Sequence, residues 1–168
     1  MIVAAVTAVT LFVSAGAASG EGNRVVASAS GDWSMSGQAA GSIFAIGPFA
    51  FNVRVYADGS AAGRFDYTQV RDGGEPLVVR GSLDCATIAG NQAWVGGVIE
   101  ESSRASLVGL DMWFQVQDNG EGASDPPDMS STIGAGGPGT GEQYCDDAPV
   151  VLFPFFLGAG NLQVRPAS

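Results

Sequence analysis

The densest group of side chains able to do chemistry lies in one short segment, DNGEGASDPPD, at residues 118–128. Its oxygen-bearing candidates are Asp118, Asn119, Glu121, Asp125 and Asp128. Calcium binds six or more oxygens from carboxylates, amides and backbone carbonyls, and an acidic glycine-rich loop can supply several of them. We predict no cofactor for this chain except a calcium ion at this loop. The alternative is that these residues only form the sharp turn that Asp, Asn and Gly favour.

The chain contains no histidine and no lysine. This absence excludes histidine-based catalytic triads, histidine zinc sites and lysine Schiff bases. Carboxylate chemistry remains, as in glycoside hydrolysis, where two acids flank the scissile bond at roughly 5 to 9 Å from each other. No spacing among the 17 acidic residues selects such a pair. We therefore predict that the protein is not an enzyme, and a carboxylate-based glycoside hydrolase is the second alternative to our main hypothesis.

The chain has two cysteines, Cys85 and Cys145. An even number of cysteines in an exported protein favours a disulfide, because the compartments outside the cytoplasm are oxidising. The alternative is two separate buried thiols. A bridge that closes a loop of about 60 residues would stabilise the fold by roughly 4 kcal/mol, according to the chain-entropy argument.

The first residues have the pattern of a secretory signal peptide. An uncharged apolar run at residues 2–13 is followed by small residues, with Ala15 and Ala17 at the positions that a signal peptidase recognises. The run is shorter than the roughly 20 apolar residues that a membrane span needs. We predict a signal peptide at residues 1–17 and a single all-β domain at residues 18–168.

Acidic residues strongly outnumber basic ones, since seven arginines face 17 acids and the formal net charge is −10. Such a balance disfavours binding to nucleic acid phosphates and to anionic membrane surfaces. Together with the predicted signal peptide, it indicates a secreted, extracellular protein. Its expected partner is a cell-surface or extracellular protein.

Alternation of apolar and polar residues predicts β-strands throughout the domain. Residues 49–55 and 64–68 alternate on either side of Asp58-Gly59, which is the pattern of a β-hairpin. Residues 93–99 are apolar on both faces, as expected for a strand that is covered on both sides. This pattern therefore predicts a single antiparallel β-barrel or a two-sheet sandwich, in either case with about eight strands.

Two finer predictions concern the second half of the domain. Val79, Gly81, Leu83 and Cys85 are spaced by two residues, so we expect all four side chains on one face of a strand. The glycine-rich segment at residues 134–141 is expected to be a flexible loop.

The triplet Gly31-Asp32-Trp33 resembles the GxW motif on the first strand of lipocalins. The resemblance implies a secreted β-barrel that holds a small apolar ligand, which is the first alternative function. An internal apolar cavity is the expected site for such a ligand. Its predicted lining is Phe49, Phe51, Phe65, Trp94 and Phe114.

A broader resemblance covers most of the mature chain. The segments PFAFNVRVYADGSAAGRFDY, GSLDCATIAGNQAWVGGVI and WFQVQDNGEGASDPPDMSS, together with the closing GNLQVR, are similar to a group of exported bacterial β domains of unknown activity. The most specific elements are DNGEG followed by Asp128, and the final GNLQV. Some members of the group lie beside cell-surface anchoring modules. The resemblance implies no catalytic residue, and our main hypothesis is a non-enzymatic structural or interaction module.

Overall fold

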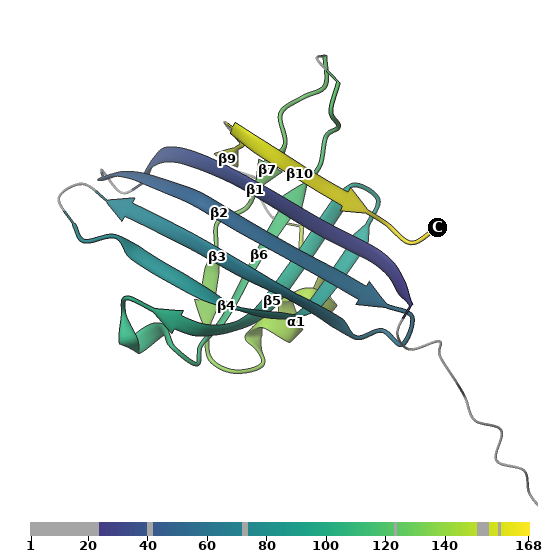
Figure 1. Ribbon diagram of the computed structural model, residues 1–168, viewed down its shortest axis with the longest axis horizontal. Coiled ribbons are helices and arrows are strands. Elements are labelled where there is room, and N and C mark those ends of the chain that lie inside the picture. Colours follow the sequence, from purple (N-terminus) through teal and green to yellow (C-terminus); the bar gives the residue numbers. More distant parts are fainter. Residues whose placement is uncertain (1–23, 40–41, 72–73, 123, 151–154, 158) are drawn as a thin grey trace, which may run out of the picture.

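The structure of the chain is a computed structural model (Figure 1). It describes residues 24–39, 42–71, 74–122, 124–150, 155–157 and 159–168. The predicted signal peptide at residues 1–17 lies outside the described residues. Within the part that the structure describes, no helix has the length and apolar character needed to cross a membrane.

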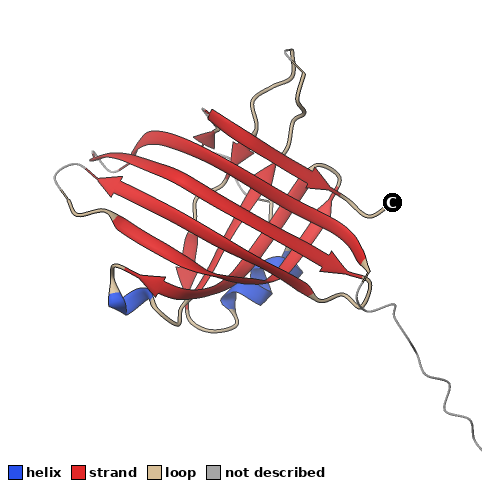
Figure 2. Ribbon diagram, viewed as in Figure 1, coloured by secondary structure: helices blue, strands red, loops and turns tan. Residues whose placement is uncertain are grey.

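Most of the described chain belongs to one antiparallel β-sheet, drawn in red in Figure 2. Its strands are β1 (Val25–Ala39), β2 (Ser42–Tyr56), β3 (Ala61–Arg71), β4 (Leu77–Ala89), β5 (Gln92–Ser102), β6 (Asp111–Gln117), β7 (Met129–Ser130), β8 (Gly134–Gly136), β9 (Phe155–Phe156) and β10 (Ala159–Arg165). The strand order is β10-β1-β2-β3-β4-β5-β6-β7-β9, and β8 also pairs with β6.

The sheet curls on itself, so that β10, β1, β2, β3 and β4 lie in front of β5 and β6 and cross them at an angle in Figure 1. We call these five strands the front layer. The prediction of an all-β fold is confirmed. The described strands form a continuous curled sheet, as in an open barrel, instead of two stacked sheets. The ten described strands exceed the expected number of about eight, in part because β8 lies in the glycine-rich segment that was predicted to be a flexible loop.

The hydrophobic core fills the inside of the curl, and alternate residues of every long strand supply it. The predicted hairpin at residues 49–68 is confirmed, with Phe51 paired to Phe65 across β2 and β3. Trp33 on β1 and Phe114 on β6 are among the largest buried side chains, with exposures of 2 % and 0 %. The core therefore lies between the front layer and β6.

The two helical segments lie on the outside of the sheet (Figure 2). They are the short 3-10 helix η1 (Ala105–Leu107) and the helix α1 (Thr140–Asp147). Helix α1 packs mainly against β5, and also against β4 and β6. This explains why residues 93–99 are apolar on both faces, since one face points into the core and α1 covers part of the other.

Two sequence predictions differ from the structure. The pairing of β4 with β5 shifts between Leu83 and Cys85, where Asp84 forms a β-bulge. A bulge adds one residue and reverses the faces that follow it, so Cys85 points outward to α1 instead of sharing the inner face of Leu83.

The glycine-rich segment is not a continuous flexible loop. Residues 134–136 form β8, which pairs with residues 111–113 of β6, and α1 begins at Thr140. A Cβ atom on Gly134 would lie 2.4 Å from Nε1 of Trp113, so the indole ring requires glycine at this position. The glycines here allow close packing against an aromatic ring.

Candidate functional site

The acidic segment at residues 118–128 forms the loop between β6 and β7, which projects at the top of Figure 1. The Asp118 carboxylate accepts hydrogen bonds from the backbone amide of Gly120 at 2.9 Å and from that of Val164 at 2.9 Å. The second bond joins the end of β6 to β10, the first strand in the sheet order. Asp118 therefore connects two parts of the sheet that are not neighbouring strands.

Two other acids of the loop also accept hydrogen bonds from its backbone. The Asp125 carboxylate accepts one from the amide of Gly122 at 2.7 Å, and the Asp128 carboxylate accepts one from the amide of Asn119 at 2.8 Å. Burial raises the pKa of Asp128, and the nearby charge of Asp118 adds to this effect, while the Asn119 amide opposes it. These contacts make the loop a self-organised turn.

The remaining two predicted ligands differ in their surroundings. The Asn119 side-chain oxygen accepts a hydrogen bond from Gln117 at 2.7 Å, and its amide nitrogen donates one to the carbonyl of Pro127 at 2.8 Å. Glu121 is exposed. Among the described residues, no three acidic, cysteine or histidine side chains are grouped as a metal site. Calcium binding thus stays a prediction, made from ligand type alone.

The calcium prediction can be tested by a thermal melt. An ion that binds the native loop and not the unfolded chain must raise the melting temperature. We expect a higher melting temperature in millimolar calcium than in excess chelator, because Asp118, Asp125 and Asp128 would bind the ion in the folded loop. Asp125→Asn should then reduce the shift. An unchanged melting temperature at millimolar calcium rejects the prediction.

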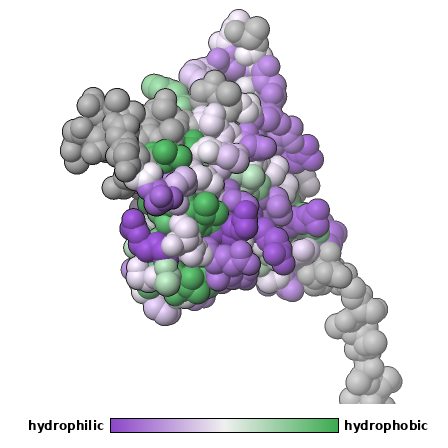
Figure 3. Space-filling view, turned by 60° about the vertical axis from the view of Figure 1, so that its left-hand side comes forward, coloured by the Kyte–Doolittle hydropathy of each residue, from purple (hydrophilic) through white to green (hydrophobic). Residues whose placement is uncertain are grey.

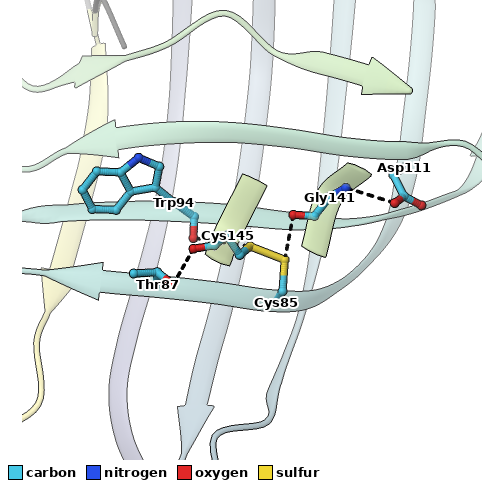
Figure 4. Close-up of a disulfide and its surroundings, with 6 residues drawn as sticks. All are labelled: Cys85, Thr87, Trp94, Asp111, Gly141 and Cys145. Atoms are coloured by element: carbon cyan, nitrogen blue, oxygen red, sulfur yellow. Dashed lines mark hydrogen bonds between the residues drawn. A yellow bond between two sulfur atoms is a disulfide. The ribbon is translucent and has the colours of Figure 1, made fainter. Parts of the chain in front are cut away.

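The predicted disulfide between Cys85 and Cys145 is present and attaches α1 to β4, with the two Cα atoms 6.2 Å apart (Figure 4). Thr87 donates a hydrogen bond to the carbonyl of Cys145 at 2.7 Å. At the other end of the helix, the amide of Gly141 donates to the Asp111 carboxylate at 3.0 Å. Three contacts thus fix a helix of only eight residues.

A groove of about 400 Å³ lies beside this disulfide. It is lined by Asp84, Cys85, Val98, Asp111, Gly139 and Glu142. Its three carboxylates come from three different elements: the bulge in β4, the start of β6 and the first turn of α1. Burial is the main cause that raises the pKa of Asp84. The charges of Asp111 and Glu142 raise this pKa further, while a hydrogen bond from the backbone amide of Asp84 itself lowers it.

This groove was not identified from the sequence. The signal that was present is the cysteine pair, because the predicted bridge already places Asp84 near Glu142, three residues before Cys145. Nothing in the spacing places Asp111 there. That residue is 7 % exposed and serves both the groove and the helix.

The raised pKa of Asp84 has a consequence for stability. The carboxyl of Asp84 binds its proton more tightly in the folded protein than in the unfolded chain. The protein therefore loses stability as the pH rises from the pKa of Asp84 in the unfolded chain through its higher pKa in the folded protein. We expect Asp84→Asn to raise the melting temperature at pH 7 and to leave it unchanged near pH 3, where the acid is largely protonated in both states. High salt should reduce the gain by screening Asp111 and Glu142. Equal melting temperatures at pH 7 would contradict this expectation.

The predicted lining of an internal ligand cavity consists mainly of core residues in mutual contact. The ring centroids of Phe49 and Phe114 are 5.0 Å apart, and those of Phe51 and Phe114 are 5.1 Å apart. Trp94 lies on the other side of the sheet, where its indole N–H donates to the carbonyl of Pro149 at 2.9 Å. These ring contacts give no support to an internal apolar pocket.

The outer face of the front layer carries a second feature that sequence reasoning missed. Arg165 of β10 pairs with Ser28 of β1, and Ser28 pairs with Arg54 of β2. Two residues before Arg54, on the same face, Asn52 pairs with Arg64 of β3. The three arginines are exposed. They therefore cross the sheet along one line.

The line continues onto β4. Asp66 lies two residues after Arg64 on the same face and pairs with Arg80. Arg80 donates to the Asp66 carboxylate at 2.7 Å and lies 3.7 Å from the Glu101 carboxylate, and both acids raise its pKa. Within the described residues, the structure records no ion pair to the other three arginines. We call Arg165, Arg54, Arg64 and Arg80 the arginine stripe.

A hollow of about 320 Å³ lies at one end of the arginine stripe. Its lining includes Asn52, Arg64, Asp66, Arg80 and Glu101. In Figure 3, hydrophilic side chains dominate the right-hand part of the surface, and hydrophobic ones gather toward the left.

Comparison of the chain with models of known protein families, with curated proteins and with solved structures finds no match.

Proposed function

We propose that this chain is a secreted, non-enzymatic binding module whose contact surface is the outer face of the front layer. The observation that carries the proposal is the arginine stripe. Four of the seven arginines lie along this line, although the chain as a whole has a net charge of −10. An acidic protein that gathers its cations on one face can attract an anionic partner there and repel it elsewhere.

The strands give this face a rigid support. Strands β1 and β2 have 15 residues each, and the side chains beneath them belong to the aromatic core. Binding groups on strands are held more precisely than groups on loops. The disulfide supports the extracellular part of the proposal, because such bonds persist in oxidising compartments.

The proposal is tested by co-sedimentation with washed envelopes of the producing cells. We expect the wild-type protein to sediment with the envelopes and Arg64→Glu to weaken this binding about tenfold, because it reverses the charge at the centre of the arginine stripe. The matched control is Arg104→Glu. Arg104 is exposed and lies beside η1, outside the stripe, and its substitution changes the net charge by the same amount. Absence of sedimentation, or equal loss in both variants, would overturn the proposal.

A second candidate function is carboxylate-based glycoside hydrolysis, which the groove beside the disulfide favours. Three carboxylates line that groove, and the raised pKa of Asp84 is the property that a general acid needs. Hydrolysis of a panel of chromogenic glycosides tests it. Asp84→Asn should abolish the activity. The control variant Glu121→Gln, which changes the acidic loop, should keep it. Full activity of Asp84→Asn would reject this candidate.

A further inference from the structure

We infer that the ligand of the arginine stripe is an anionic polysaccharide, that is, a chain of acidic sugars laid across the strands. The inference rests on the proposed function and names the chemistry of its partner. Guanidinium groups bind carboxylates through two parallel hydrogen bonds, so they select a negative charge and also orient the group that carries it. A polymer with repeated carboxylates matches a line of several arginines better than a single small anion does.

The length of the stripe suits an extended chain. Neighbouring strands are about 4.8 Å apart, so the four intervals from β10 to β4 span about 19 Å. The two diagonal steps, from Arg54 to Arg64 and from Arg64 to Arg80, add roughly 13 Å along the strands. The resulting line is about 23 Å long, the length of a short oligosaccharide.

The residues between the arginines also suit a sugar chain. Ser28, Asn52 and Ser82 lie on the outer face in the rows that the stripe crosses, and each can donate and accept hydrogen bonds with sugar hydroxyls. The hollow between Arg64 and Arg80 is also lined by Asp66, Glu100 and Glu101, so the carboxylates of the sugar chain would lie over Arg165, Arg54 and Arg64 and the hollow would take only sugar hydroxyls.

Two other anionic partners fit the surface less well. Tight protein interfaces use buried aromatic or large apolar anchors, whereas the apolar residues in the rows of the stripe are the small Ala50 and Ala62. Single-stranded nucleic acid needs aromatic rings for base stacking and a strongly basic groove. In the rows of the stripe, the described outer-face residues of the front layer include no aromatic ring on which a base could stack.

The inference is tested by titration calorimetry with oligogalacturonate as the acidic sugar chain and with dextran as the uncharged control. We expect binding to oligogalacturonate alone, with an affinity that falls as salt is raised. Arg54→Gln and Arg64→Gln should each lower the affinity about three- to fivefold, as expected for an exposed ion pair, and the double variant about tenfold or more. Arg104→Gln should bind as the wild type does.

Failure of the inference is distinct from failure of the proposed function. If envelopes bind the protein through Arg64 but oligogalacturonate neither binds nor competes, the binding module stands and its polysaccharide ligand is wrong. Competition by polyglutamate and not by oligogalacturonate would likewise overturn the inference and indicate an acidic protein. Equal binding of dextran would show that the arginines do not recognise charge and would also overturn it.

Discussion

Removal of the disulfide by the double change Cys85→Ala and Cys145→Ala is expected to destabilise the protein by about 4 kcal/mol. The bridge joins residues 60 positions apart, so its loss gives the unfolded chain a large gain in conformational entropy. For a domain of this size, the melting temperature should fall by roughly 8 to 16 °C. Calorimetry under oxidising conditions measures the change.

The same bond has a local effect that can be measured separately. A helix of eight residues is marginal by itself, so α1 needs its attachment to the sheet. Without the bridge, the hydrogen bonds from Thr87 to Cys145 and from Gly141 to Asp111 remain to hold it. We expect faster amide hydrogen exchange in α1 than in β2, where the strand pairing is intact.

The control is the response to a reductant. A thiol reductant should lower the melting temperature of the wild type to that of the double variant and should leave the double variant unchanged. If the wild type keeps its melting temperature after thiol titration shows full reduction, the bridge contributes little to stability and the expectation is wrong.

The sequence predicts the parts of this fold that depend on local alternation. Apolar residues at every second position identify the hairpin of β2 and β3, because one face of each strand must pack in the core. Apolar residues on both faces identify β5 as a strand covered from both sides. In each case the burial of a side chain follows from its neighbours along the chain, so no knowledge of distant contacts is needed.

Irregular positions depend on pairing between strands, which the sequence does not specify. The bulge at Asp84 changes the face of Cys85, although no residue type at this position signals it. Strand β8 lies in the glycine-rich segment, where no alternation of apolar and polar residues indicates a strand, so its pairing with β6 decides its conformation.

The candidate sites show the same division. The acidic loop is visible in the sequence, but its carboxylates accept hydrogen bonds from amides as distant as Val164, and only the fold determines such partners. The arginine stripe depends on the register of five strands. Arg54, Arg64 and Arg165 are unremarkable as separate surface residues, and their alignment follows from the pairs that Ser28 and Asn52 make.

Gly97→Ala is expected to destabilise the protein by about 3 kcal/mol, because it forces backbone apart where β4 and β5 pair. A Cβ atom on Gly97 would lie 2.0 Å from the carbonyl oxygen of Ser82 and 2.7 Å from the Cα atom of Leu83. These are backbone atoms, so no side-chain rotation can make room. The two strands must separate, which disturbs the wall between the core and α1.

Urea denaturation of Gly97→Ala and of Gly137→Ala measures the effect against a matched control. A Cβ atom on Gly137, in the loop before α1, meets no atom within 4 Å, so this variant should stay within about 0.5 kcal/mol of the wild type. The melting temperature of Gly97→Ala should fall by roughly 6 to 12 °C. Equal stability of the two variants would mean that β4 and β5 are not paired at the close distance that places Cys85 and Asp84 against α1.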